Sequence, residues 1–156
     1  MIDESIFETK AWLGIIKTLE ILKKEKGDEC PVLGSVVGAF SMPSILMGMD
    51  KWMNLLYSGS DRLSTMLLEK CSDFCMMKSK ALFEAGITFI TYIDPVSTSS
   101  FLTRSQFETK SLPWVKRDFS IDESKSFIYF NGGGLLNPTI ELIIENTGAG
   151  AFYINP

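Results

Sequence analysis

A helical pattern of apolar residues opens the chain. Between Ser5 and Lys26, apolar side chains recur every three or four positions, which lines one face of an amphipathic helix with Trp12, Ile15, Ile16, Leu19 and Leu22. Lysines occupy the last turn, where they oppose the negative end of the helix, and Gly27 follows as a stop signal. We therefore predict a helix that ends at Lys26.

Four later runs are apolar at successive positions instead. Short runs of this kind, rich in β-branched and aromatic residues, are typical of strands that are buried on both faces of a parallel sheet. The predicted strands are Val32–Gly38, Ile87–Ile93, Phe127–Phe130 and Ala151–Ile154.

Helical segments separate these strands. They are predicted at Pro43–Tyr57, from the cap at Ser60 to Gly86 with a stripe from Leu63 to Leu82, at Arg104–Trp114 with a bend at Pro113, and at Pro138–Asn146. Alternating strands and helices require right-handed crossovers and a parallel sheet. We predict one α/β domain over residues 1–156. Because a (β/α)₈ barrel needs roughly 250 residues, we expect a partial TIM barrel of about four parallel strands with flanking helices.

The composition narrows the class of protein. The chain has 156 residues, 46% hydrophobic and 22% charged, with a net charge of −4, so we expect no nucleic-acid partner. No apolar stretch reaches the ~18 residues of a membrane span, so we expect no membrane partner. The first residues are acidic where a secretory signal is basic, and the three cysteines suit a reducing compartment, so we expect a cytoplasmic protein. The sequence contains no histidine, which excludes Ser-His-Asp and Cys-His nucleophiles and histidine metal ligands.

Two segments that follow predicted strands are candidates for ligand contacts. Asp94 stands where an apolar strand meets a Ser/Thr-rich loop, so it either contacts a substrate or caps the loop. The turn formed by Asn131, Gly132, Gly133 and Gly134 leads toward a helix, so it is either an anion-binding nest or a plain turn. No catalytic residue is assigned from these patterns.

Other notable side chains have simpler interpretations. Cys71 and Cys75 lie one helical turn apart among apolar residues, which favours core packing, and we expect the same of Cys30. A cluster of methionines around Trp52 either packs against the rest of a barrel or binds a large flat ligand or a partner protein. We expect residues 116–118 to form a solvated face.

Several motifs, in order along the chain, resemble the uroporphyrinogen decarboxylase superfamily. They are Gly27-Asp28-Glu29, Pro31 to Gly34, Gly38-Ala39-Phe40, Glu84-Ala85-Gly86, Ile93-Asp94-Pro95 with Ser97, then Leu102, Ser105 and Phe107, Asn137-Pro138 and Asn146 to Ala149. The resemblance is greater to the methylcobamide:coenzyme M methyltransferase branch. It implies that the chain matches the middle of a (β/α)₈ barrel, whose ligand cleft would be lined by Phe40, Ser41, Asp94, Ser97 and residues 131–134.

The resemblance also has implications for cofactors. The methyltransferase branch places a zinc-binding His-x-Cys-Gly motif before its Asn-Pro turn, and the matched positions here are Asn131 and Gly133. Neither side chain is a zinc ligand, so we expect no metal there. A corrinoid or another tetrapyrrole remains a possible substrate.

Three functions therefore stay open: methyl transfer between a methylcobamide and a thiol or folate by a partial or degenerate member, decarboxylation of a tetrapyrrole, and non-catalytic binding of a tetrapyrrole or corrinoid protein. Four strands would leave two free sheet edges and an apolar face. We therefore expect either a homo-oligomer or the remainder of a longer chain to cover them.

Overall fold

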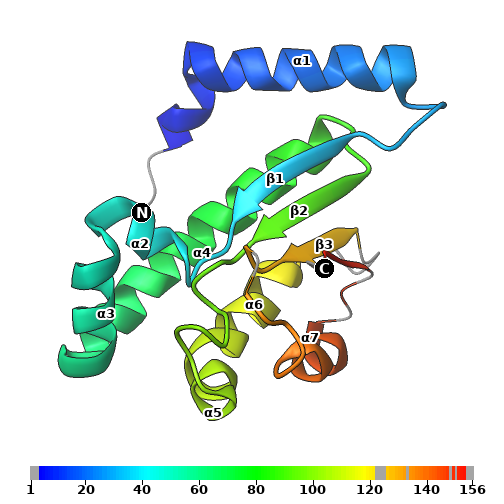
Figure 1. The fold of residues 1–156 in the computed structure, drawn as a ribbon. Helices are drawn as coiled ribbons and strands as arrows, with labels where there is room; N and C mark the ends of the chain where they lie inside the picture. The colour runs from blue at the N-terminus through cyan, green and yellow to red at the C-terminus, as the bar shows by residue number, and fades with distance from the viewer. Residues whose placement is uncertain (1–3, 122–125, 133, 148, 150, 154–156) are drawn as a thin grey trace.

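One parallel sheet organises the molecule. The computed structural model describes residues 4–121, 126–132, 134–147, 149 and 151–153. Each strand pairs with the next along the chain, in the order β1-β2-β3-β4 (Figure 1). The strands are β1 Leu33–Val37, β2 Phe89–Ile93, β3 Phe127–Phe130 and β4 Ala151–Tyr153. The predicted α/β class and sequential parallel order are confirmed.

The helices differ from the prediction mainly in their breaks. Their bounds are α1 Lys10–Lys26 after the 3₁₀ turn η1 Glu4–Glu8, α2 Met42–Met47, α3 Met49–Ser58, α4 Asp61–Glu84, α5 Arg104–Gln106, the π-helical turn η2 Phe107–Ser111, α6 Leu112–Phe119 and α7 Ile140–Thr147. Within the described ranges, no helix is both long and apolar enough to span a membrane.

Local residue chemistry explains these breaks. The hydroxyl of Thr9 accepts a bond from the Trp12 N–H and starts α1 after the 3₁₀ turn. Gly48 has φ +89°, a left-handed conformation that separates α2 from α3. Pro113 lies in the first turn of α6, where proline is tolerated, so the helix continues to Phe119 instead of ending near Trp114.

Helix α4 lies against the sheet through small side chains. Its buried positions are Ser64, Leu68, Cys71, Ser72, Cys75, Ser79 and Leu82. The predicted stripe was wrong at Leu63, which is 57% exposed. Going back from Cys71, the helical period passes through Leu68 and Ser64, so Leu63 lies outside the packed face.

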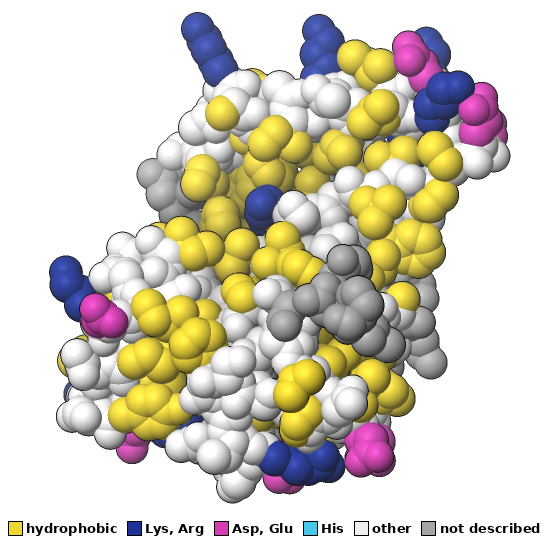
Figure 2. All heavy atoms as spheres, viewed as in Figure 1, with side chains coloured by type: hydrophobic (Ala, Val, Ile, Leu, Met, Phe, Trp, Pro, Cys, Tyr) yellow, Lys and Arg dark blue, Asp and Glu magenta, His cyan; other side chains and the backbone are white. Residues whose placement is uncertain are grey.

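In the described part of the chain, helices cover one face of the sheet and leave the other open. Five side chains on the covered face are each at most 1% exposed: Val36, Ile90, Tyr92, Phe127 and Tyr129. Alternate residues on the opposite face are half-buried or exposed, including Leu33, Phe89, Ile93, Ile128 and Phe130. In Figure 1, α4 passes behind β1 and β2, so the reader faces the open side, and Figure 2 shows hydrophobic side chains gathered there. The sheet therefore has a covered face and an apolar open face.

Candidate functional site

The candidate residues lie in three loops that follow the carboxyl ends of neighbouring strands. Phe40 and Ser41 follow β1, Asp94 and Ser97 follow β2, and the 131–134 turn follows β3. Because the strands are parallel and paired in register, these loops lie together at the carboxyl ends of the strands. Phe40 is fully buried, and its ring packs edge-on against Trp52 at 5.6 Å.

Asp94 links the first two loops. It continues the alternation of Ile90 and Tyr92, so its fully buried carboxylate lies on the helix-covered side of the sheet. Ser41 Oγ donates to Oδ1 at 2.5 Å, and the Tyr129 hydroxyl donates to Oδ2 at 3.1 Å. Burial raises the pKa of Asp94 above its ordinary value, and the bonds from Ser41, Ser97 and Tyr129 oppose this rise.

Ser41 also positions the loop after β2. Its Oγ accepts the backbone N–H of Val96 at 2.9 Å while donating to Asp94. Further along that loop, the Ser97 and Ser111 hydroxyls lie 2.6 Å apart, which ties it to the π-helical turn η2. The Asp94 carboxylate thus braces a loop framework, and its contact with a substrate remains a prediction.

The glycine turn packs closely against the loop after β2. Gly132 has φ +69°, and a Cβ there would lie 2.5 Å from Pro95 Cβ. A Cβ on Gly134 would lie 2.6 Å from Thr98 Cβ, and Asn131 Nδ2 donates to the Gly134 carbonyl at 2.5 Å. Close approach accounts for the glycines at 132 and 134. Gly133 lies outside the described residues, and the anion nest stays a prediction.

A second buried carboxylate, Asp118, corrects the expected solvated face at residues 116–118. It is fully buried on α6 and accepts bonds from Ser72 Oγ at 2.5 Å, Tyr92 Oη at 2.7 Å and the Ala39 N–H at 3.0 Å. Burial raises its pKa from the usual 3.8 to about 6, against the effect of these bonds. Asp118 comes three residues after the buried Val115, a helical spacing that could have indicated its burial.

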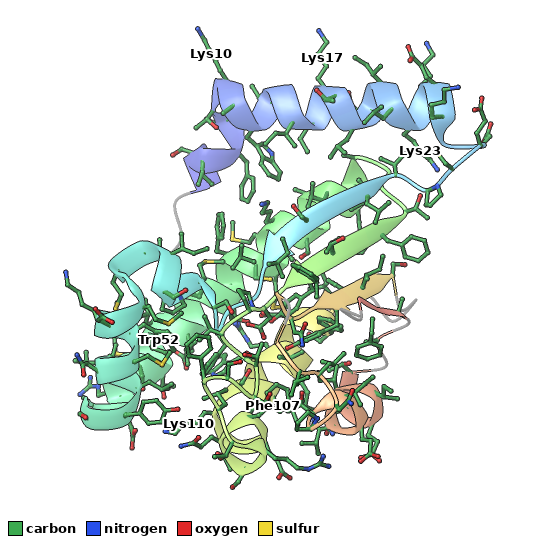
Figure 3. All side chains as sticks on the ribbon, viewed as in Figure 1. Lys10, Lys17, Lys23, Trp52, Phe107 and Lys110 are labelled. Carbon is green, nitrogen blue, oxygen red and sulfur yellow. The ribbon has the colours of Figure 1, made fainter. Side chains whose placement is uncertain are left out.

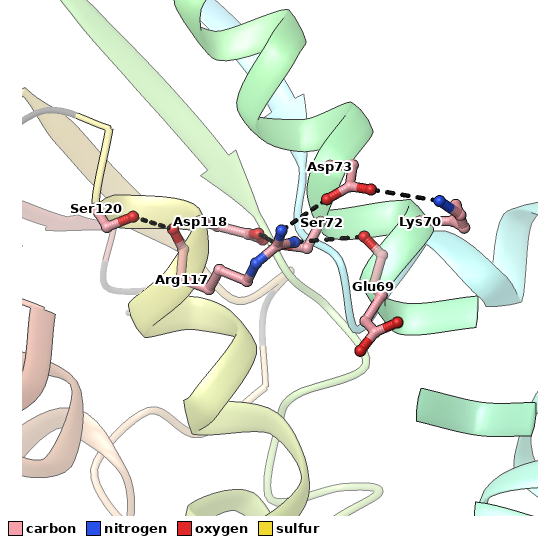
Figure 4. Close-up of polar contacts among 7 residues, drawn as sticks. All are labelled: Glu69, Lys70, Ser72, Asp73, Arg117, Asp118 and Ser120. Carbon is pink, nitrogen blue, oxygen red and sulfur yellow. Dashed lines mark hydrogen bonds and ion pairs between the residues drawn. The ribbon is translucent and has the colours of Figure 1, made fainter. Parts of the chain in front are cut away.

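The side chain of the neighbouring Arg117 contacts helix α4 instead of the sheet. Its Nη2 lies 2.6 Å from Asp73 Oδ1, and its Nη1 donates to the Glu69 carbonyl, both on α4 (Figure 4). Adjacent residues therefore fasten α6 to α4 by an outer ion pair and to the sheet by an inner carboxylate.

The thiols divide by burial. Cys71 and Cys75 are buried as predicted, whereas Cys30 is exposed, so its expected burial was wrong. Cys30 lies three residues before the first residue of β1 and stays outside the core. Burial, with a smaller effect of Asp118, raises the pKa of Cys71 to about 11 and also raises that of Cys75. Among the described residues, no three acidic or cysteine side chains gather as a metal-binding group.

The methionine cluster contributes to the core beside Trp52. Met42, Met47, Met49 and Met53 are partly buried against it. The neighbouring Ile45 and Leu46 are 69% and 65% exposed. The cluster therefore packs inward, while the outer side of α2 presents apolar side chains to solvent.

Comparisons with known proteins agree with this architecture. Residues 4–156 match the family model described as Uroporphyrinogen decarboxylase (URO-D). The chain is 35% identical over 103 residues to the methylcobamide:CoM methyltransferase MtbA of Methanosarcina mazei and 33% identical over 103 residues to that of Methanosarcina acetivorans. These matches cover 66% of this chain and 30% of each relative.

A solved methyltransferase from Methanosarcina mazei has the same fold with a TM-score of 0.83 at 16% identity. That match covers 94% of this chain and 42% of the methyltransferase, which confirms the predicted partial barrel. The chain belongs to the uroporphyrinogen decarboxylase (URO-D) family.

Proposed function

We propose that this chain binds a methylated corrinoid at the carboxyl ends of its strands, as the donor-holding part of a methyltransferase site. The observation that carries the proposal is the 33–35% identity to two proteins named methylcobamide:CoM methyltransferases. Both relatives are about three times as long as the matched segment, so the proposal concerns the ligand and not their whole activity.

The surface of the strand-end loops supports a large apolar ligand. Phe101, after β2, is 42% exposed, and Leu135, after β3, is 71% exposed. A bond of 3.2 Å from Ser99 Oγ to the Leu135 carbonyl holds the two loops together, and the Tyr57 hydroxyl donates to the Phe101 carbonyl at 2.9 Å. Apolar side chains on fixed loops suit the broad face of a corrin ring.

In this proposal the chain holds the corrinoid and does not activate a thiol acceptor. A thiol must lose its proton to attack a methyl group, so a site that activates an acceptor needs a group that lowers the pKa of that thiol. Asn131, at the position matched to the family's histidine ligand, supplies no imidazole. Methyl transfer by the chain itself is the competing possibility.

A binding titration tests the proposal. Methylcobalamin is added to the purified chain, and quenching of tryptophan fluorescence is followed to saturation. We expect Leu135→Ala to weaken binding roughly tenfold, as the loss of ~1.4 kcal/mol of apolar contact would. Leu22→Ala is the matched control, because this leucine is 43% exposed in the last turns of α1, before the amino end of β1.

Three outcomes would contradict the proposal: no binding, equal weakening by both variants, or preferential binding of uroporphyrin over methylcobalamin. A parallel incubation with methylcobalamin and a thiol, with and without zinc, is read from the corrin absorbance. Turnover in that assay would replace the binding role with methyl transfer.

A further inference from the structure

The two edge strands of the sheet could pair with each other through their free backbone groups. Within the described part of the chain, β1 and β4 are the edge strands and each pairs on one side only. Free parallel edges present unpaired N–H and C=O groups that favour the addition of another strand. A structure of four sequential parallel strands has half of the eight that close a (β/α)₈ barrel.

A groove follows the free edge of β1. Two adjoining hollows of about 320 and 230 Å³ lie along it and share Lys78 of α4. The first is bounded by Ile15 and Leu19 of α1, and the second by Ile45 and Leu46 of α2. Figure 2 shows hydrophobic side chains on both sides of this hollowed region, below α1. The groove therefore has the apolar lining that an added strand would cover.

Helix α1 lies where the helix that connects an added strand to β1 would lie in a barrel. It precedes β1 and lies beyond the edge of β1 that has no neighbouring strand among the described residues (Figure 1). Its contact with α4 includes the stacked rings of Phe7, in the preceding turn η1, and Phe74, with centroids 6.3 Å apart. A strand added at β1 would lie under α1, and the helix preceding that strand would become the neighbour of α1.

We propose that two copies of this chain associate through their free sheet edges, with β1 of each copy beside β4 of the other, and close an eight-stranded barrel. From its described residues, each copy supplies four strands and the four outer helices α1, α4, α6 and α7. Because α7 precedes β4, this pairing sets α7 of one copy beside α1 of the other.

The charges of α1 and α7 suit this contact. Helix α1 has five lysines and two glutamates, whereas α7 has two glutamates and no basic residue. On α1, Lys10, Leu13 and Lys17 share one stripe, and Figure 3 shows both lysines projecting away from the sheet. On α7, Ile144 is 48% exposed beside the exposed Glu145. Both helices thus expose an apolar side chain near charged residues, which are lysines on α1 and a glutamate on α7.

Strand β4 offers a matching side chain to the groove. The register pairs Phe152 with Tyr129, which lies on the helix-covered face, and the two rings are 6.2 Å apart. When β4 of one copy pairs with β1 of the other, Phe152 lies on the groove side. An aromatic ring beside the half-buried Lys78 would form a cation–π contact in an apolar setting.

Charge reversal at the α1–α7 contact tests the proposal. Sedimentation velocity and light scattering on the full chain should give twice the monomer mass of 17.4 kDa. Lys17→Glu alone and Glu145→Lys alone each place like charges at both symmetric contacts. We expect each to raise the dimer dissociation constant roughly tenfold to a hundredfold.

Mixing the two single variants provides the decisive arm. In a mixed dimer, one contact joins the two substituted side chains, whose charges are exchanged and therefore still opposite. The other contact joins the native Lys17 with the native Glu145, so both contacts are attractive. We expect the mixture to form dimers at concentrations where each variant alone is monomeric. Lys51→Glu, on the exposed side of α3, is the matched control and should leave the dimer unchanged.

Several results would overturn the proposal. A monomeric wild-type chain would show that the groove is covered by another polypeptide or stays open. A dimer insensitive to both reversals, or a mixture no more dimeric than its components, would place the contact elsewhere. Circular dichroism of every variant checks that the fold is retained.

Discussion

Asp118 makes the stability of this protein depend on pH in an unusual direction. Its pKa is about 6 in the fold and 3.8 ordinarily, so between these values the native state holds a proton that the unfolded chain has released. Acid therefore stabilises the native state relative to the unfolded chain, and this contribution is lost as the pH rises through 6. A rise of about two pKa units corresponds to roughly 3 kcal/mol of unfolding free energy.

The Asp118→Asn variant should remove this dependence without breaking the hydrogen-bond network. An amide oxygen in place of Oδ2 still accepts from Tyr92 and from the Ala39 N–H. The amide nitrogen in place of Oδ1 donates to Ser72 Oγ, because a hydroxyl is both donor and acceptor. The variant should therefore match the neutral form of the native aspartic acid.

Urea unfolding between pH 4 and pH 8, followed by tryptophan fluorescence, measures the effect. We expect the wild-type unfolding free energy to fall by roughly 2.5 kcal/mol more than that of Asp118→Asn over this range, because at pH 4 part of the full effect is already lost. The buried Asp94 contributes to both curves, so their difference reports Asp118 together with its electrostatic interaction with Asp94. Asp28→Asn changes an exposed aspartate and serves as the control. Parallel curves for the wild type and Asp118→Asn would refute the reasoning.

Two further predictions concern the glycines and the thiols. Gly132→Ala should lower the unfolding free energy by at least ~1 kcal/mol, because Gly132 has a positive φ and a Cβ there would lie 2.5 Å from Pro95 Cβ. Gly14→Ala, in α1 with nothing within 4 Å, should raise the unfolding free energy by up to ~1 kcal/mol. Equal urea midpoints for the two variants would contradict this prediction. With Ellman's reagent at pH 8, Cys30 should react rapidly in the folded chain, whereas the buried Cys71 and Cys75 should react only after unfolding. Rapid reaction of all three thiols without denaturant would show that the packing of the helices on the sheet is open.

The sequence predicted the strands well because their signal is local. Runs such as Ile87–Ile93 are apolar at successive positions, which indicates a strand, although the expected burial on both faces is found on the helix-covered face only. The break at Gly48 was missed because one glycine in a helical pattern marks either a tolerated interior residue or a left-handed turn. The extension of α6 to Phe119 was missed because Pro113 was interpreted as a bend instead of a first-turn residue.

The polar network could not be derived from the sequence to the same extent. Asp94 was identified from its place at a strand end, but its bond with Ser41 joins residues 53 positions apart. The burial of Asp118 on α6 depends on its hydrogen bonds with Tyr92 of strand β2 and Ser72 of helix α4. Such partners are set by tertiary packing, and a charged triplet such as Lys116-Arg117-Asp118 gives no local indication of them.

Because successive loops are bonded to one another, the loops after the strands cannot be exchanged one at a time in protein engineering. Ser41 holds the loop after β2 through Asp94 and Val96, and that loop holds the next through Ser99 and the close contact of Pro95 with Gly132. Replacing one loop with that of a relative removes the anchors of its neighbour. A chimera that is meant to acquire a new ligand preference therefore needs all three loops transplanted together, with their serines and glycines as a single cassette.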